Sequence, residues 1–216
     1  MSSLQVLFAA AAAACVAGVP AARADVSYQY DDGLGNVRTT TRFAADMLWG
    51  NCFTTQPGGE TITQIGVGFG RLATGTPIRL WVFADPTNDF DPRDAVLLSE
   101  STATSGLAQL GVINYYAIRP VAVSGVFFVA VSTLTDGGIN AVPARVDVDG
   151  TAFAARSWIF AADQIDGRNL GSAPYSVNLT QNVPQGTFVI RAVGVPAPAS
   201  AGLLGVAALA ASRRRR

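Results

Sequence analysis

The sequence predicts an all-β fold, an antiparallel and jelly-roll-like β-sandwich of about ten strands. Residues 25–194 contain no stretch with the periodicity of an amphipathic helix. Instead, short runs of Val, Ile, Thr and aromatic residues recur every 10 to 15 residues, and Gly, Pro, Asp and Asn separate them. Half of the residues are hydrophobic and only 14% are charged, which indicates a packed core rather than disorder.

The expected strands follow one another along a single domain, residues 25–194. Because no helices are available to cover a parallel sheet, two antiparallel sheets packed face to face are expected. The run 126–131 is apolar on both faces, which is typical of a central strand. A short helix over Ala161–Leu170 is an alternative, although Gly167 argues against a long one. The expected strands are Val26–Tyr30, Val37–Arg42, Met47–Thr54, Thr61–Phe69, Ile78–Phe83, Ala95–Ser101, Val112–Ile118, Val126–Thr133, Ala152–Phe160 and Thr187–Val193.

The composition argues against an enzyme. The chain contains no His, so general bases, nucleophile pairs and zinc sites that depend on His are excluded. Its two Cys are too few for a structural zinc cage. Asp147 and Asp149 share one face of a strand and could serve a glycosidase only if their separation in space suited it. A hydrolase therefore stays an alternative that no positive feature favours.

The N-terminus predicts export. Leu4–Val19 is almost purely apolar, and the small-x-small pattern of Ala22 and Ala24 follows it, as at a signal peptidase site. Residues 1–24 are therefore expected to be a helical signal peptide, with Asp25 as the first residue of the mature protein. A membrane-anchoring helix is the alternative, but the apolar stretch is shorter than the about 20 residues of a membrane span.

The C-terminal segment 195–216 combines three features: a Pro-x-Pro pair, an apolar run and a cluster of four Arg. Four consecutive Arg favour the cytoplasmic side of a membrane. The apolar run from Ala199 to Ser212 has 14 residues. As a helix it would span about 21 Å, which is short for a hydrocarbon core of about 30 Å. A transient membrane association is therefore expected, and a lasting membrane anchor is the alternative.

This tail resembles the PEP-CTERM sorting signal of Gram-negative bacteria that make exopolysaccharide. The usual motif of that family is Val-Pro-Glu-Pro, and Ala197 stands here in place of the Glu. The resemblance implies that an exosortase-like membrane transpeptidase cleaves near Pro198. Segments 30–33, 48–51 and 59–65 also resemble those of secreted β-sandwich proteins from such bacteria. The residues that match the sorting signal are Val195, Pro196, Pro198, Arg213, Arg214, Arg215 and Arg216.

The loop 85–94 is a candidate calcium site. Carboxylate and amide oxygens are the hard ligands that Ca²⁺ prefers. The alternative is a solvated turn, in which Asp, Asn and Pro restrict the backbone and supply local hydrogen bonds. Phe90 and Pro92 depart from the pattern of an EF-hand loop. The candidate ligands are Asp85, Asn88, Asp89, Asp91 and Asp94.

Aromatic side chains offer a second possible site. Five aromatic residues could form a flat platform for sugar rings: Trp49, Trp81, Trp158, Tyr115 and Tyr116. The alternative is that the tryptophans belong to the core, because the domain carries little charge.

Cys52 remains alone once the signal peptide is removed. It is expected to be a buried thiol that acts as a small hydrophobe.

The mature domain has 10 Arg against 15 acidic residues, a net charge of −5, which argues against nucleic acid as a partner. An exported protein of the cell envelope or extracellular space is therefore expected, with a structural or adhesive role among extracellular polysaccharide. A carbohydrate-binding module, assisted by calcium, is the alternative. Signal peptidase and an exosortase-like enzyme are the expected processing partners.

Overall fold

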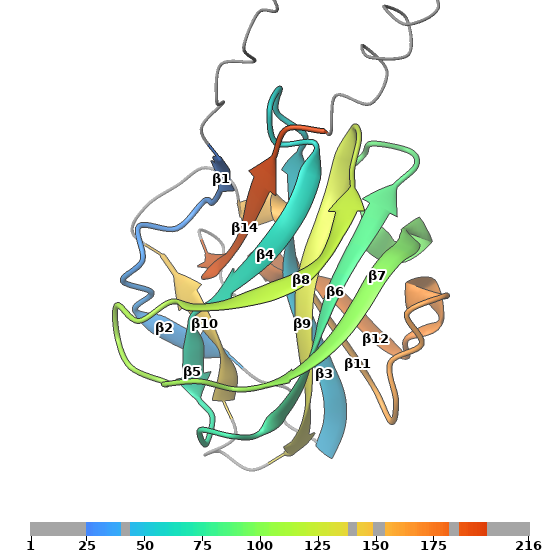
Figure 1. Cartoon of the computed structure of the whole chain (residues 1–216). Coiled ribbons are helices and arrows are strands. Elements are labelled where there is room, and N and C mark those ends of the chain that lie inside the picture. The colour runs from blue at the N-terminus through green and yellow to red at the C-terminus, as the bar shows by residue number, and fades with distance from the viewer. Residues whose placement is uncertain (1–24, 40–43, 138–141, 149–153, 182–185, 198–216) are drawn as a thin grey trace, which may run out of the picture.

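The all-β class is confirmed by a computed structural model, in which antiparallel sheets pack together (Figure 1). It describes residues 25–39, 44–137, 142–148, 154–181 and 186–197. The expected N-terminal signal helix and C-terminal apolar helix lie outside these ranges. Among the described residues, no helix is long and apolar enough to cross a membrane. The helical elements described are four turns of 3-10 helix, η1 (Pro92–Asp94), η2 (Ala154–Arg156), η3 (Leu170–Ser172) and η4 (Leu179–Gln181).

The largest sheet has six strands in the order β12-β11-β3-β9-β6-β7. The two strands at its centre, β3 and β9, pair along eleven residues each and are almost wholly buried. The prediction of a central strand over residues 126–131 is therefore confirmed. The strands are β3 (Ala44–Thr54), β6 (Pro77–Asp85), β7 (Val96–Thr104), β9 (Val126–Asp136), β11 (Ser157–Ala162) and β12 (Tyr175–Asn178).

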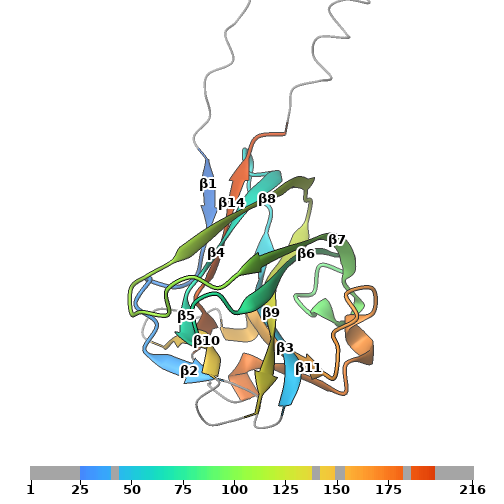
Figure 2. The same ribbon diagram turned by 60° about the horizontal axis from the view of Figure 1, so that its bottom comes forward.

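Two smaller sheets pack against the six-stranded one. The first has the order β1-β14-β4-β8, and in the second β10 pairs with β13, β2 and β5. Because β1 and β14 are antiparallel neighbours, β1 begins at the end of the sandwich where β14 stops (Figure 2). The strands are β1 (Val26–Tyr28), β2 (Val37–Thr39), β4 (Thr61–Val67), β5 (Phe69–Arg71), β8 (Asn114–Ala122), β10 (Val142–Asp147), β13 (Thr187–Phe188) and β14 (Ile190–Val195).

Two segments that the sequence presents as single strands change sheet halfway. The run 61–69 divides into β4 and β5 at Gly68, and the run 187–193 divides into β13 and β14 at Val189. The two corners meet, because the Gly68 amide donates to the Val189 carbonyl over 2.8 Å. Such corners let one strand serve two sheets and fold them around a common core.

The six-stranded sheet is covered on both faces. Every second residue along its strands, such as Trp49 and Val129, faces the two smaller sheets and belongs to the main core. The residues between them, such as Phe128 and Phe160, point to the opposite face of this sheet, which loops cover. Ile165 and Leu170 of the loop after β11 belong to this second cluster. The alternation follows from the two-residue period of a strand, with both faces buried.

Several boundaries differ from the sequence prediction. β10 was not predicted, because Pro143 and Arg145 interrupt its apolar pattern. The edge strand β12 was not predicted either, because its four residues are only partly buried. The alternative of a helix over 161–170 is wrong: β11 continues to Ala162, and turns follow up to η3. The described residues thus contain fourteen strands rather than about ten.

Candidate functional site

The three tryptophans lie in the core and do not form an exposed platform. Trp49 is 0% exposed, Trp81 1% and Trp158 9%. Trp49 faces the main core, whereas the other two belong to the second cluster, under the covering loops. Trp81 Nε1 donates to Ser132 Oγ over 3.1 Å. The sugar platform predicted for these residues is therefore wrong, and the alternative of core packing is confirmed.

Asp85 organises the loop that was predicted to bind calcium. Its side chain is buried, and its two carboxylate oxygens accept four hydrogen bonds from within the loop. The donors are the Thr87 amide and hydroxyl at 3.1 and 3.0 Å, and the Asn88 and Phe90 amides at 2.8 and 2.9 Å. This network holds Asn88 and Phe90 at φ of 57° and 66°, where side chains other than Gly are uncommon.

Only three of the five predicted calcium ligands converge. Asp85, Asp89 and Asp94 each offer a carboxylate oxygen, and these oxygens lie within 4.8 Å of one another. Asn88 is turned away, because its Oδ1 accepts from the Val126 amide over 2.7 Å. Asp91 instead forms an ion pair with Arg93. The set that could hold a cation is therefore Asp85, Asp89 and Asp94, and calcium binding stays a prediction.

The Arg93 guanidinium sets the ionisation of Asp91. The hydrogen bond from the Arg93 side chain lowers the pKa of Asp91 below its ordinary value, against a smaller opposing effect of burial. Asp91 also accepts from the Arg93 amide over 3.1 Å and so caps η1. This carboxylate therefore fixes the end of the loop.

The Phe90 carbonyl fastens the same loop to the outer face of the six-stranded sheet. Trp158 Nε1 donates to it over 2.8 Å, and Cys52 Sγ lies 3.6 Å from it. The aromatic ring of Phe90 is covered by Arg156, whose guanidinium carbon lies 4.1 Å from the ring centroid. The loop is thus a structural cover for the second cluster.

Cys52 is the buried thiol that the sequence predicts. Burial raises its pKa well above the ordinary value, and the carboxylate of Asp85 adds to the shift. We expect the native thiol to resist a thiolate-specific reagent at pH 8 and to react at once after unfolding in guanidinium chloride, because only the thiolate is nucleophilic. Absorbance of the released chromophore measures both rates. Equal rates in the native and unfolded protein would contradict this assignment.

A buried ion pair joins the loop after β1 to β14. Arg191 donates to Asp31 Oδ1 through Nη2 at 2.6 Å and through Nε at 3.1 Å. The Asp31 side chain is 0% exposed and that of Arg191 14%. The neighbouring Gly33 has φ of +92° and leaves space for the guanidinium, because a Cβ there would lie 3.0 Å from Nη2. No local pattern in the sequence indicates this pair, because its two residues are 160 positions apart.

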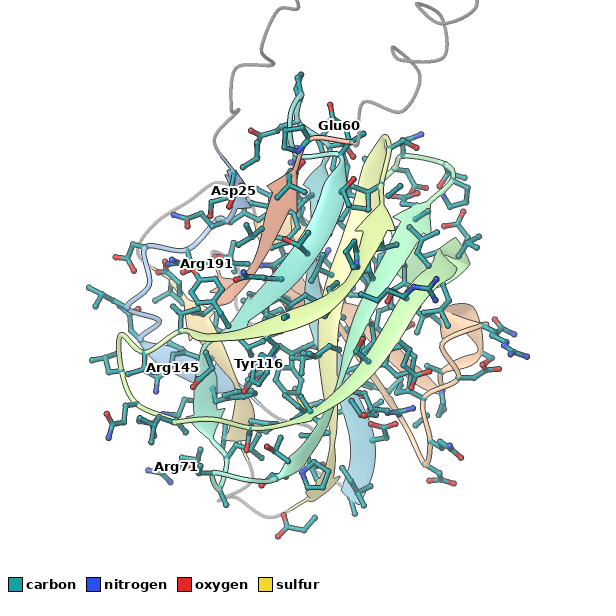
Figure 3. The ribbon with its side chains drawn as sticks, viewed as in Figure 1. Asp25, Glu60, Arg71, Tyr116, Arg145 and Arg191 are labelled. Carbon is teal, nitrogen blue, oxygen red and sulfur yellow. The ribbon has the colours of Figure 1, made fainter. Side chains whose placement is uncertain are left out.

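Tyr115 lies beside that ion pair. In the register of the sheet, Gly66 of β4 is opposite both Arg191 of β14 and Tyr115 of β8. Burial lowers the pKa of Arg191, but hydrogen bonds to Asp31 and to Tyr115 outweigh it, so that the pKa is raised overall. The three side chains therefore lie together on the outer surface of the four-stranded sheet, where Figure 3 shows Arg191 beside β14.

Two further buried charges, both on β10, contact the loop after β1. Asp147 Oδ2 accepts from the Asp32 amide over 2.9 Å, while Asp149 lies outside the described residues, so their pairing is not observed. The Arg145 side chain donates to the Phe69 and Gly35 carbonyls over 2.9 and 3.0 Å. Desolvation, and then the charge of Arg38, lower the pKa of Arg145.

Several hollows of the described surface lie around the loop after β11. One, of about 480 Å³, is lined by Arg79, Glu100 and the segment 164–168. Its aromatic residue, Trp81, is closed off: Arg79 lies 4.6 Å from the ring centroid, and a Cβ on Gly167 would lie 2.4 Å from the ring. This hollow therefore presents charged groups but no open aromatic face.

Few of the predicted sorting residues are described. Asp25 is exposed and immediately precedes β1. Val195 is the last residue of β14 and pairs with Thr61, and Pro196 follows it. The remaining predicted residues, Ala22, Ala24, Pro198, Arg213, Arg214, Arg215 and Arg216, lie outside the described residues.

No known family model matches the chain, and no curated protein matches it. Among solved structures, the chain is similar to the clostridial cysteine protease Cwp84 after propeptide cleavage, with TM-score 0.49 and 12% identity over 80% of this chain and 40% of that one. It is also similar to a structure of the cysteine protease and lectin-like domains of Cwp84, a surface layer associated protein of Clostridium difficile, with TM-score 0.43 and 13% identity. That match covers 70% of this chain and 32% of the other. The chain thus spans less than half of either protein, and no activity is transferred from them.

Proposed function

We propose that this chain is an exported, non-enzymatic protein of the cell envelope or extracellular matrix, with a structural or adhesive role among extracellular polysaccharide. The observation that carries the proposal is the segment 195–216, in which a Pro-x-Pro pair, an apolar run and four Arg follow one another. Its resemblance to the PEP-CTERM signal supports sorting by an exosortase-like enzyme.

The placement of the chain ends supports this use. Val26 pairs with Gly194, so the first and last strands leave the sandwich at the same end. The apolar run begins at Ala199, four residues after Val195, a reach of about 14 Å at most. While the apolar run is in the membrane, that end of the domain would face the membrane. The sheet faces would then be available to an extracellular partner.

The ionisable groups support a role without catalysis. The chain has no His. Within the described residues, four carboxylates are held in ion pairs with arginines: Asp31 with Arg191, Asp91 with Arg93, and both Asp46 and Glu100 with Arg79. Such pairs hold carboxylates in fixed positions and leave them poorly placed to exchange protons with a substrate.

The intact mass of the exported protein tests the proposal. In a bacterium with an exosortase, we expect protein recovered outside the cell to begin at Asp25 and to lack Arg213 to Arg216. A variant in which each of these four Arg is replaced by Ser should lose processing, since positive charge holds the tail on the cytoplasmic side. Extracellular protein that still carries the four Arg would contradict the proposal.

A further inference from the structure

We infer that the outer face of the sheet β1-β14-β4-β8, centred on Tyr115 and the Arg191–Asp31 pair, is a binding platform for an uncharged polysaccharide chain. This inference rests on the proposed function and names its ligand class. It keeps Tyr115 from the aromatic residues predicted to form a sugar platform and leaves out the three tryptophans, because Tyr115 is exposed and the tryptophans are buried.

Tyr115 is the only exposed aromatic side chain within the described residues, at 49%. Its ring lies over Gly66, where a Cβ would come within 2.7 Å of Tyr115 Cε1. Because Gly66 has no side chain, the Tyr115 ring can pack directly against the sheet surface. A ring supported in this way presents a fixed apolar face to solvent, which suits the C–H face of a sugar.

Arg191 supplies fixed hydrogen-bond donors beside that ring. The bonds from Nε and Nη2 to Asp31 hold the guanidinium in place, and in the register of the sheet Tyr115 lies across Gly66 from Arg191. Because the carboxylate balances the positive charge, the pair does not favour an anion strongly. Polar groups that are held in place before binding lose little freedom when a ligand arrives.

The neighbouring cross-strand residues on the same face include two exposed polar side chains, those of Gln64 and Ser27. Gln64 of β4 is exposed and lies opposite Ala117 of β8 and Val193 of β14. Ser27 of β1 is exposed and pairs with Val193. Because side chains two residues apart share a face, these groups lie on the same side as the ring and the ion pair. The four strands are about 14 Å across from first to last, room for more than one sugar ring.

Hydroxyl groups of a sugar both donate and accept hydrogen bonds. The Gln64 amide and the Ser27 hydroxyl offer both functions, and Arg191 donates. One aromatic face with a few placed polar groups is the usual composition of a small-molecule site. An uncharged polysaccharide therefore fits the surface better than an apolar peptide, although Leu34 and Leu110 are exposed beside Gly111 at its margin.

Affinity electrophoresis of the exported protein tests the platform. The protein is run through native gels that contain dextran, hydroxyethyl cellulose or alginate at increasing concentration, and the dissociation constant follows from the mobility. We expect at least one of the two uncharged polymers to retard the protein. Tyr115→Ala should weaken that binding about three- to tenfold, since the stacking contact is lost. Tyr115→Phe, which keeps the ring, should retain most of it.

Leu134→Ala is the matched control, because Leu134 is 72% exposed on β9 and lies outside the platform. Its binding and the melting temperature of every variant should equal those of the wild type. The inference is overturned if neither uncharged polymer retards the protein, or if Tyr115→Ala binds as the wild type does. Arg119 of β8 is exposed and lies four residues after Tyr115, on the same face. Retardation by alginate alone that disappears in Arg119→Ala would also overturn the inference. So would a dimer in light scattering that Tyr115→Ala abolishes, because the face would then serve self-association.

The two levels of the proposal can fail separately. If the protein is exported and processed but no uncharged polymer retards it, the platform is wrong and the envelope role stands. If polymers bind through Tyr115 but the chain keeps Arg213 to Arg216 outside the cell, the processing proposal is wrong and the platform stands.

Discussion

Replacing Asp31 with Ala is expected to lower the free energy of unfolding by about 3–5 kcal/mol. The change leaves the Arg191 guanidinium, only 14% exposed, without the carboxylate that neutralises it. Breaking such a pair from one side costs more than the pair itself contributes, because the remaining charge stays mostly buried and is only partly hydrated. Denaturant unfolding followed by tryptophan fluorescence measures the loss.

Asp32→Ala is the control for this change, because Asp32 is the next residue, carries the same side chain and is exposed. Its carboxylate accepts only from the Leu34 amide in the turn, so a loss of about 1 kcal/mol is expected. In the double variant Asp31→Ala with Arg191→Met, no unpaired charge remains, and part of the stability should return. Equal losses for Asp31→Ala and Asp32→Ala would contradict the buried pair.

Asp85→Ala is expected to have the second largest effect, a loss of about 3–4 kcal/mol. Three backbone amides of one loop would lose their side-chain acceptor, whereas the Thr87 hydroxyl could still donate to Asp94. Because that loop covers the second cluster, we also expect the native thiol of Cys52 to become reactive. Equilibrium unfolding and thiol titration measure the two effects.

Asp91→Ala separates a general effect of charge in this loop from the specific role of Asp85. Asp91 pairs with Arg93, whose side chain is 54% exposed, and it caps η1. Loss of an exposed pair and a short cap should cost about 1 kcal/mol. If the two Asp variants are equally stable, Asp85 does not organise the loop.

The melting temperature also tests the calcium prediction. A rise in millimolar Ca²⁺ that chelator reverses, and that Asp89→Asn removes, would identify the three convergent carboxylates as the site. A melting temperature that does not change would leave Asp85 as a structural carboxylate only.

Hydrophobic periodicity in the sequence was enough to predict the fold class and the central strand β9, since a run that is apolar on both faces needs neighbours on both sides. It was not enough to show where a strand changes sheet. The corner at Gly68 depends on a hydrogen bond to Val189, which is far away in the chain. The alternation in β6 and β11 shows that Trp81 and Trp158 point away from the main core, but not that loops cover them.

The candidate site was harder to predict for the same reason. Asp31 and Arg191 are 160 residues apart, and no local pattern relates them. Gly66 within a strand was the available signal, because a glycine there often marks a close approach by a neighbouring side chain. In this chain that neighbour is Tyr115. The calcium ligands were predicted from residue type alone, and the backbone turned Asn88 and Asp91 elsewhere.

The most direct test of the envelope role is where the mature protein resides in cells that make an extracellular polysaccharide. The full chain is expressed with its own ends, and the matrix, outer membrane and cytoplasm are separated and probed with an antibody to the domain. We expect the processed protein in the matrix fraction, and its release into the medium when polysaccharide synthesis is disabled. Unprocessed protein confined to the cytoplasm, whether or not the polysaccharide is made, would contradict the central claim.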